Sequence, residues 1–131
     1  MKITKNFTLA ELTKTTTEIE NVPNRQQISA LIMLCGKVLQ PARNLYGEAI
    51  HVSSGFRSPA VNQAVGGARN SQHQLGEAAD ITTYSRTGNK KLFEIIRDHL
   101  NFDQLINERD YSWIHVSYRL VGENRKEVLK L

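Results

Sequence analysis

Apolar residues recur with helical spacing in two stretches of the chain. In the first, every third or fourth residue is apolar, which predicts one long amphipathic helix through Ile28, Leu31, Ile32, Cys35, Val38, Leu39, Ala42 and Leu45. We expect Pro41 to kink this helix, and Gly47 stands where a left-handed residue would end it. The second helix carries Leu92, Ile95, Ile96 and Leu100, and we expect Asn89 to cap its start.

Two shorter helices are indicated by their start signals. Thr8-Leu9-Ala10-Glu11 has the form of a capping box, with Phe7 and Leu12 placed for a hydrophobic staple. Ser58-Pro59 has the form of an N-cap followed by proline in the first helical turn. Both short helices should therefore start at defined residues.

The second half of the chain is dominated by strand patterns. Short strands are predicted at residues 50–53 and 78–83, a β-hairpin at 102–107 and 113–118, and an edge strand at 128–131. Helices come first and a mainly antiparallel sheet follows, without internal repeats or an evident linker. This order predicts a single α+β domain over residues 1–131, with helices packed on a central sheet.

Composition excludes several classes of protein. The chain of 131 residues is long enough to bury a core, and its one cysteine, Cys35, cannot form an intrachain disulfide. No apolar run approaches the roughly 20 residues that span a bilayer, and the polar N-terminus has no signal-peptide pattern. We therefore expect a protein made in the cytoplasm, with no membrane contact. The net charge of +4 permits an anionic partner, but no nucleic-acid-binding motif accompanies it.

Two histidines and an aspartate are the residues most suggestive of chemistry. Gly76 permits a sharp turn between His73 and the strand that carries Asp80, so the carboxylate can point back at His73. Strand alternation places His115 on the face opposite the core residues Ile114 and Val116. Two histidines and one aspartate suit catalytic zinc, which lowers the pKa of bound water to about 7 and polarises a carbonyl. On spacing alone, ordinary surface residues are the more frequent explanation.

Longer motifs surround these residues. Ser71-x-His73-x-x-Gly76-x-Ala78-x-Asp80 is followed by Trp113-x-His115, and further blocks stand in order at 7–12, 39–43, 54–59, 62, 65–67 and 102–106. Together they resemble the zinc D-Ala-D-Ala carboxypeptidase family, and block 7–12 resembles its phage-type branch. The resemblance covers nearly the whole chain. It implies one zinc peptidase domain with the hedgehog/DD-peptidase-like fold.

The resemblance also implies roles for particular residues. The family's ligands of one zinc ion fall on three residues: His73, Asp80 and His115. Arg57 corresponds to an arginine that binds and polarises the substrate, with a structural salt bridge as the alternative. Ser71 binds substrate or merely shapes its turn. Trp113 shares the face of His115, so we expect it to line the substrate groove.

A hydrolase of this kind also needs a general base. Several family members place a glutamate three residues before the last histidine, where this chain has Ser112. Glu108 matches the alternative position, near the end of the preceding strand. A hairpin loop of two or four residues would turn Glu108 toward the face of His115, whereas three residues would turn it away. We expect an even loop, with Asp110 exposed at its tip.

The resemblance implies hydrolysis of an amide bond in peptidoglycan stem peptides, as a D-Ala-D-Ala carboxypeptidase or as an endopeptidase. The phage-type block suggests an endolysin or prophage product, which would be a monomer and would reach the wall after release or lysis. Ser112 keeps a second hypothesis open, a non-catalytic zinc-containing wall-binding module of the same fold. A nucleic-acid-binding domain is a third hypothesis, supported only by the net charge.

Overall fold

A mixed sheet of five strands lies at the centre of the fold. The computed structural model describes residues 1–131, and the strand order is β3-β4-β6-β5-β7. The strands are β3 His51–Ser54, β4 Ala78–Thr82, β5 Gln104–Glu108, β6 Trp113–Ser117 and β7 Glu127–Lys130. All neighbours are antiparallel except β5 and β7, because the loop 118–126 crosses the start of β5 and enters β7 from the same end. The expected α+β fold and edge strand are confirmed, with one parallel pair in the sheet.

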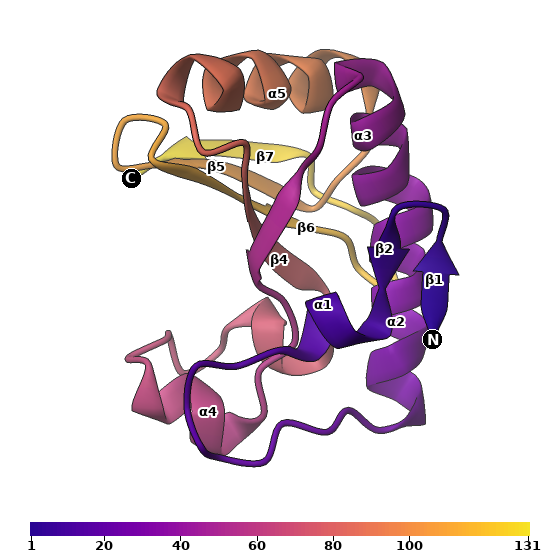
Figure 1. Ribbon diagram of the computed structural model, residues 1–131, viewed down its shortest axis with the longest axis vertical. Coiled ribbons are helices and arrows are strands. Elements are labelled where there is room, and N and C mark those ends of the chain that lie inside the picture. Colours follow the sequence, from indigo (N-terminus) through magenta and orange to yellow (C-terminus); the bar gives the residue numbers. More distant parts are fainter.

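Helices cover one face of this sheet. Figure 1 shows α2 (Arg25–Leu34), the π-turn η1 (Cys35–Leu39) and α3 (Gln40–Tyr46) as one helical column along the side of the sheet, with α5 (Arg86–His99) across one end. The core between them is apolar, and its sheet side consists of Val52, Ala79, Ile81, Leu105, Ile114 and Val116. No helix is both long enough and apolar enough to cross a bilayer. Alternate residues of the same strands face away from this core, and there they form the candidate site.

The remaining elements lie against the helical column or near the end of the sheet opposite α5. They are the small hairpin of β1 (Lys2–Thr4) and β2 (Phe7–Thr8), the short helices α1 (Leu9–Thr13) and α4 (Pro59–Ala64), and the 3-10 turn η2 (Gln72–Leu75). Both predicted start signals are confirmed. Thr8 and Glu11 form the capping box, and Ser58 Oγ accepts a hydrogen bond from the Val61 N–H at 3.2 Å. The left-handed residue that ends α3 is Gly47, with φ of 85°.

The long helix departs from regular geometry one turn before Pro41. The Gln40 N–H donates to the Cys35 carbonyl, which widens this turn into the π-turn η1. Proline has no N–H, and its ring crowds the carbonyl four residues earlier, here that of Lys37. The irregularity expected at Pro41 is therefore present as a widened turn that lies before the proline.

The prediction that Asn89 caps α5 is wrong. Ser85 caps this helix, since its Oγ accepts a hydrogen bond from the Gly88 N–H at 3.1 Å. Asn89 lies one turn further along and is buried. Its amide oxygen accepts from the Thr83 N–H at 2.8 Å, and its amide nitrogen donates to the Tyr111 carbonyl at 2.9 Å. A residue of a capping type thus joins α5 to two loops instead of starting the helix.

Candidate metal centre

His73 is held in one orientation by its surroundings. It lies in η2, where Ser71 Oγ accepts a hydrogen bond from the His73 N–H at 3.2 Å and Gly76 ends the turn with φ of 74°. The His73 residue is only 2% exposed. Its Nδ1 is 2.7 Å from the Gly55 carbonyl, which can only accept, so Nδ1 carries the proton and donates. Nε2, which faces Asp80, is therefore the nitrogen that would bind a metal ion, in exchange for any proton it carries.

Asp80 and His115 reach the same point from neighbouring strands. They are directly opposite each other in the pairing of β4 with β6. Asp80 Oδ1 lies 3.0 Å from His115 Nδ1 and 3.3 Å from His73 Nε2, and the three potential ligand atoms lie within 4.8 Å of one another. With zinc bonds of roughly 2.0–2.1 Å, neighbouring ligand atoms of a tetrahedral site are about 3.3 Å apart. The cluster therefore fits one zinc ion.

The charge state of Asp80 also suits a metal ligand. Burial raises the pKa of this carboxyl group, but hydrogen bonds and charge from His115 and His73 outweigh it and hold the pKa well below its usual range. Arg57 Nη2 lies 3.2 Å from the second carboxylate oxygen, Oδ2. Asp80 is thus ionised, with Oδ2 held by Arg57 and Oδ1 directed at the two histidines.

Arg57 is fixed by three partners inside the protein. Besides Asp80, its guanidinium donates from Nε to Ser54 Oγ at 2.9 Å and from Nη1 to Asn62 Oδ1 at 3.2 Å. The salt bridge considered as an alternative role is therefore present. Arg57 nevertheless lines the cleft above the cluster, and a guanidinium has five N–H donors, so two remain for a substrate. Neither Ser54 nor Asn62 was identified as a support for Arg57 from the sequence.

The backbone at Gly55 connects the metal centre to the N-terminal helix. A Cβ at this position would lie 2.3 Å from the Leu12 carbonyl oxygen, which accepts a hydrogen bond from the Phe56 N–H at 2.7 Å. Only glycine allows this close approach, and the Gly55 carbonyl then faces His73. Sequence reasoning missed this role because it belongs to a main-chain atom.

Glu108 faces the cleft, as the argument from hairpin register requires. Glu108 pairs with Trp113, so the loop between β5 and β6 has four residues, and the prediction of an even loop is confirmed. Both residues share a sheet face with His115, and all three line one cleft. The guanidinium of Arg109 lies over the Trp113 ring, 5.8 Å from its centroid.

The loop after Glu108 has an unusual backbone. Residues 109–111 all have positive φ, of 48°, 53° and 60°, which L-amino acids rarely adopt in succession. Two side chains hold the turn. Asn107 Oδ1 accepts from the Tyr111 N–H at 2.6 Å, and Asn89 binds the Tyr111 carbonyl from the side of α5. Asp110 is exposed at the tip, as expected. These contacts fix the chain on both sides of the turn that follows Glu108.

The remaining candidates divide between the cleft and its edge. Ser71 lines the cleft and also caps η2, so the turn-forming role is present. Ser112 stabilises the loop, since its Oγ donates a hydrogen bond to the Arg109 carbonyl at 2.6 Å. Ser112 does not line the cleft. Apart from the potential ligand Asp80, the acid that lines the cleft is Glu108.

The site and a comparison with known protein families together define the class of protein to which the chain belongs. A largely buried His-Asp-His cluster in a cleft of an α+β domain, with His73 the most buried of the three, is an arrangement suited to metal-dependent hydrolysis. The family model for peptidase M15 matches residues 5–117, and the chain therefore belongs to the peptidase M15 family.

A curated relative narrows the comparison. The chain is 36% identical over 98 residues to the zinc D-Ala-D-Ala carboxypeptidase of Streptomyces albus G, a match that covers 72% of this chain. The same match covers 37% of the relative, so the chain spans little more than a third of that protein's length. The family resemblance and the zinc cofactor are confirmed at this level, by the relative and by a cluster that could hold the ion. Membership of the phage-type branch stays a prediction.

Proposed function

We propose that the protein is a zinc-dependent peptidase that hydrolyses an amide bond in peptidoglycan stem peptides. The observation that carries this proposal is the convergence of His73, Asp80 and His115 in a cleft that also presents Glu108. Membership of the peptidase M15 family supports peptide hydrolysis. The name of the Streptomyces albus G relative supports a D-Ala-D-Ala substrate, with carboxypeptidase or endopeptidase cleavage as the two forms of the reaction.

The ligand atoms follow from the hydrogen bonds of the cluster. His73 Nε2, Asp80 Oδ1 and His115 Nδ1 would hold the ion, and all three residues line the cleft. When bound, zinc supplies Lewis acidity, which lowers the pKa of water and polarises a carbonyl group. The Gly55 carbonyl and Arg57 keep His73 and Asp80 in place, as outer partners of metal ligands generally do.

The other cleft residues supply proton transfer and binding. Glu108 accepts a proton from the attacking water and returns it to the nitrogen of the leaving amine. The two uncommitted N–H groups of Arg57 donate to a carbonyl or carboxylate oxygen of the peptide. Trp113, which pairs with Glu108, gives the peptide an apolar wall, and Ser71 offers a hydroxyl in the same cleft.

A non-catalytic wall-binding module that keeps the zinc is the second candidate. Two observations favour it: Ser112 occupies the position where several family members have a glutamate, and three Arg57 nitrogens are already bonded within the protein. In either case, the proposal includes a monomer that acts on the cell wall after release or lysis, as an endolysin does.

Digestion of purified peptidoglycan tests the proposal. Zinc-loaded wild type should release new amine termini, and mass spectrometry of the products separates free D-Ala from internal cleavage. We expect Glu108→Gln to lower the rate about 10²–10⁴-fold while retaining zinc, because it removes the general base. Glu48→Gln, which changes the charge of an exposed loop in the same way, should keep the wild-type rate. Absence of new termini from zinc-loaded wild type would refute hydrolysis and favour the binding module.

A further inference from the structure

The cleft continues past the metal cluster to a second charged end, at the start of β5. Gln72, Gln104 and Arg125 line it there. Gln104 and Ile106 alternate on the cleft face of β5, and Ile106 lies opposite His115. Two residues of a strand span about 7 Å, so this end lies about 7 Å along β5 from the row of metal ligands.

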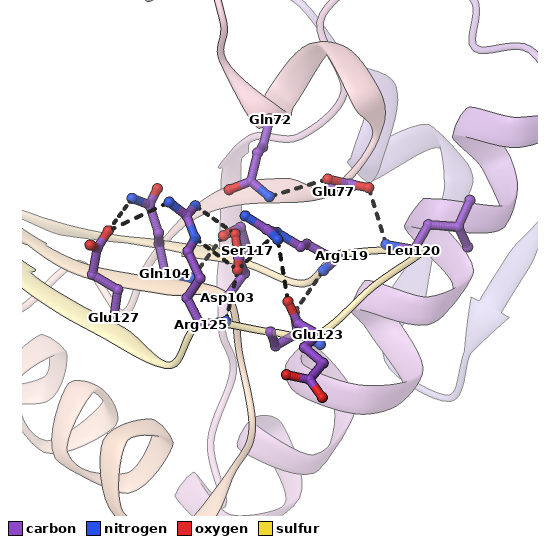
Figure 2. Close-up of polar contacts among 11 residues, drawn as sticks. Gln72, Glu77, Asp103, Gln104, Ser117, Arg119, Leu120, Glu123, Arg125 and Glu127 are labelled. Carbon is purple, nitrogen blue, oxygen red and sulfur yellow. Dashed lines mark hydrogen bonds and ion pairs between the residues drawn. The ribbon is translucent and has the colours of Figure 1, made fainter.

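A buried carboxylate organises this end of the cleft. Asp103, just before β5, is 0% exposed and lies beneath the loop 118–126. Figure 2 shows two arginines around it. Arg125 donates to Asp103 from its backbone N–H at 2.9 Å, from Nε at 3.1 Å and from Nη2 at 2.7 Å, and Arg119 Nε lies 3.1 Å from Oδ1. Two guanidinium groups surround this one carboxylate, and the two-point contact fixes the plane of Arg125.

Asp103 is ionised across the physiological range. Burial raises the pKa of its carboxyl group, but the hydrogen bonds and charge of Arg125, with the charge of Arg119, outweigh it and hold the pKa at about 2. At neutral pH the carboxylate is therefore charged and forms ion pairs with both arginines. Arg125 is 43% exposed, so its outer N–H groups remain open to the cleft.

Three other acids lie near this end, Glu77, Glu123 and Glu127, and none of them lines the cleft. Glu77 accepts hydrogen bonds from Gln72 Nε2 and from the Leu120 N–H, both at 3.1 Å, as Figure 2 shows. Glu127 accepts from Gln104 Nε2, and its Oε1 lies 4.0 Å from Arg125 Nη1. This end of the cleft therefore presents a positioned guanidinium with no carboxylate in its own lining.

We propose that Arg125 forms a subsite for a carboxylate of the substrate, away from the bond that is cleaved. The inference rests on the proposed peptidase function, because the subsite is defined by its distance from the metal cluster. A planar guanidinium pairs with a carboxylate through two parallel hydrogen bonds, which matches the chemistry of this end. In an extended peptide, about 7 Å corresponds to two residues, so the ligand is a peptide with an acidic group about two residues from the scissile amide.

Binding of matched peptides tests the subsite independently of hydrolysis. Peptides that carry glutamate or glutamine at successive positions around a D-Ala-D-Ala unit are titrated calorimetrically into the zinc-loaded Glu108→Gln protein. At one position, glutamate should bind about tenfold more tightly than glutamine. When Arg125→Gln is added to the Glu108→Gln protein, the ratio of the two affinities should fall to about one. Arg125→Lys should keep part of the preference, since lysine retains the charge but not the planar pair of N–H donors.

Arg97→Gln is the matched control, because it removes one positive charge from an exposed arginine of α5 that pairs only with Asp98. This variant should keep the wild-type ratio. Equal binding of glutamate and glutamine at every position, or a preference that survives Arg125→Gln, would overturn the subsite. Thermal unfolding verifies that each variant is folded, and Arg125→Lys provides the second test if Arg125→Gln is not. A preserved glutamate preference with no hydrolysis by wild type would refute the peptidase proposal alone.

Discussion

The two faces of β4 and β6 use neighbouring residues for different purposes. On one face, Ile81 and Ile114 are fully buried against the helices. On the other, Asp80 and His115 meet in the metal cluster. Because side chains alternate along a strand, each functional residue is flanked by residues of the core. Metal binding and stability should therefore be separable by changing adjacent positions.

The largest effect should come from His115→Ala. This substitution removes one of three ligand atoms, so zinc content after dialysis should fall to a small fraction of the wild-type value and hydrolysis to background. Metal analysis and the peptidoglycan assay measure the two effects. His51→Ala, which changes an exposed histidine of β3, is the matched control and should keep full zinc. Wild-type zinc content in His115→Ala would contradict the assigned centre.

Replacing the adjacent residue should have the opposite outcome. Ile114→Ala leaves a cavity in the core and should lower the free energy of unfolding by about 2–5 kcal/mol. Urea unfolding of the metal-free protein measures this loss, because bound zinc would add its own stabilisation. The folded variant should still bind one zinc ion. Val128→Ala, on the partly exposed β7, should change stability far less, and an equal loss there would undermine the comparison.

Gly55→Ala should lower both the stability of the protein and its affinity for zinc. The added methyl group meets the Leu12 carbonyl, so we expect about 1–3 kcal/mol of destabilisation. Displacement of the carbonyl that binds His73 should also weaken zinc binding, roughly 10–100-fold. Chemical unfolding and competition with a chelator give the two values. Gly36→Ala is the control, because a methyl group at this position meets no neighbouring atom. We expect its zinc affinity to equal that of wild type.

The effect with the narrowest range should be a loss of stability in acid, caused by protonation of Asp103. Its pKa is about 2 in the folded protein and about 3.9 in an unfolded chain, so its ionised form stabilises the fold above pH 4. This contribution disappears as the pH falls from about 4 to about 2. The difference in unfolding free energy between wild type and Asp103→Asn should narrow over that interval. A constant difference would show that the charge of Asp103 contributes nothing.

Much of the metal centre follows from local rules in the sequence. Strand alternation places His115 away from the core, and Gly76 ends the turn that aims His73 at Asp80. The loop length of the hairpin is sufficient to predict that Glu108 faces the cleft. With an even number of loop residues, Glu108 pairs with a residue that shares the sheet face of His115. These rules apply to residues that are close in sequence or joined by a short loop.

The supports of the site depend on contacts between distant segments. The Gly55 carbonyl reaches His73 across 18 positions, and Asp103 binds Arg125 across 22. Neither contact leaves a periodic pattern in the sequence. The start of α5 was misplaced for a related reason, since Ser85 and Asn89 are both capping residue types and only the packing of Asn89 against other loops distinguishes them.

The parallel strand β7 has a practical consequence for experiments on this protein. The Leu131 N–H donates to the Asn107 carbonyl at 2.9 Å, and the Leu131 carbonyl accepts from the Arg109 N–H at 2.9 Å. An affinity tag fused behind Leu131 would emerge next to the turn that follows Glu108, where it could obstruct peptide entry. In Figure 1 the N-terminus lies on the opposite side of the molecule, and its strand β1 contacts η1, so a tag placed there starts far from this turn.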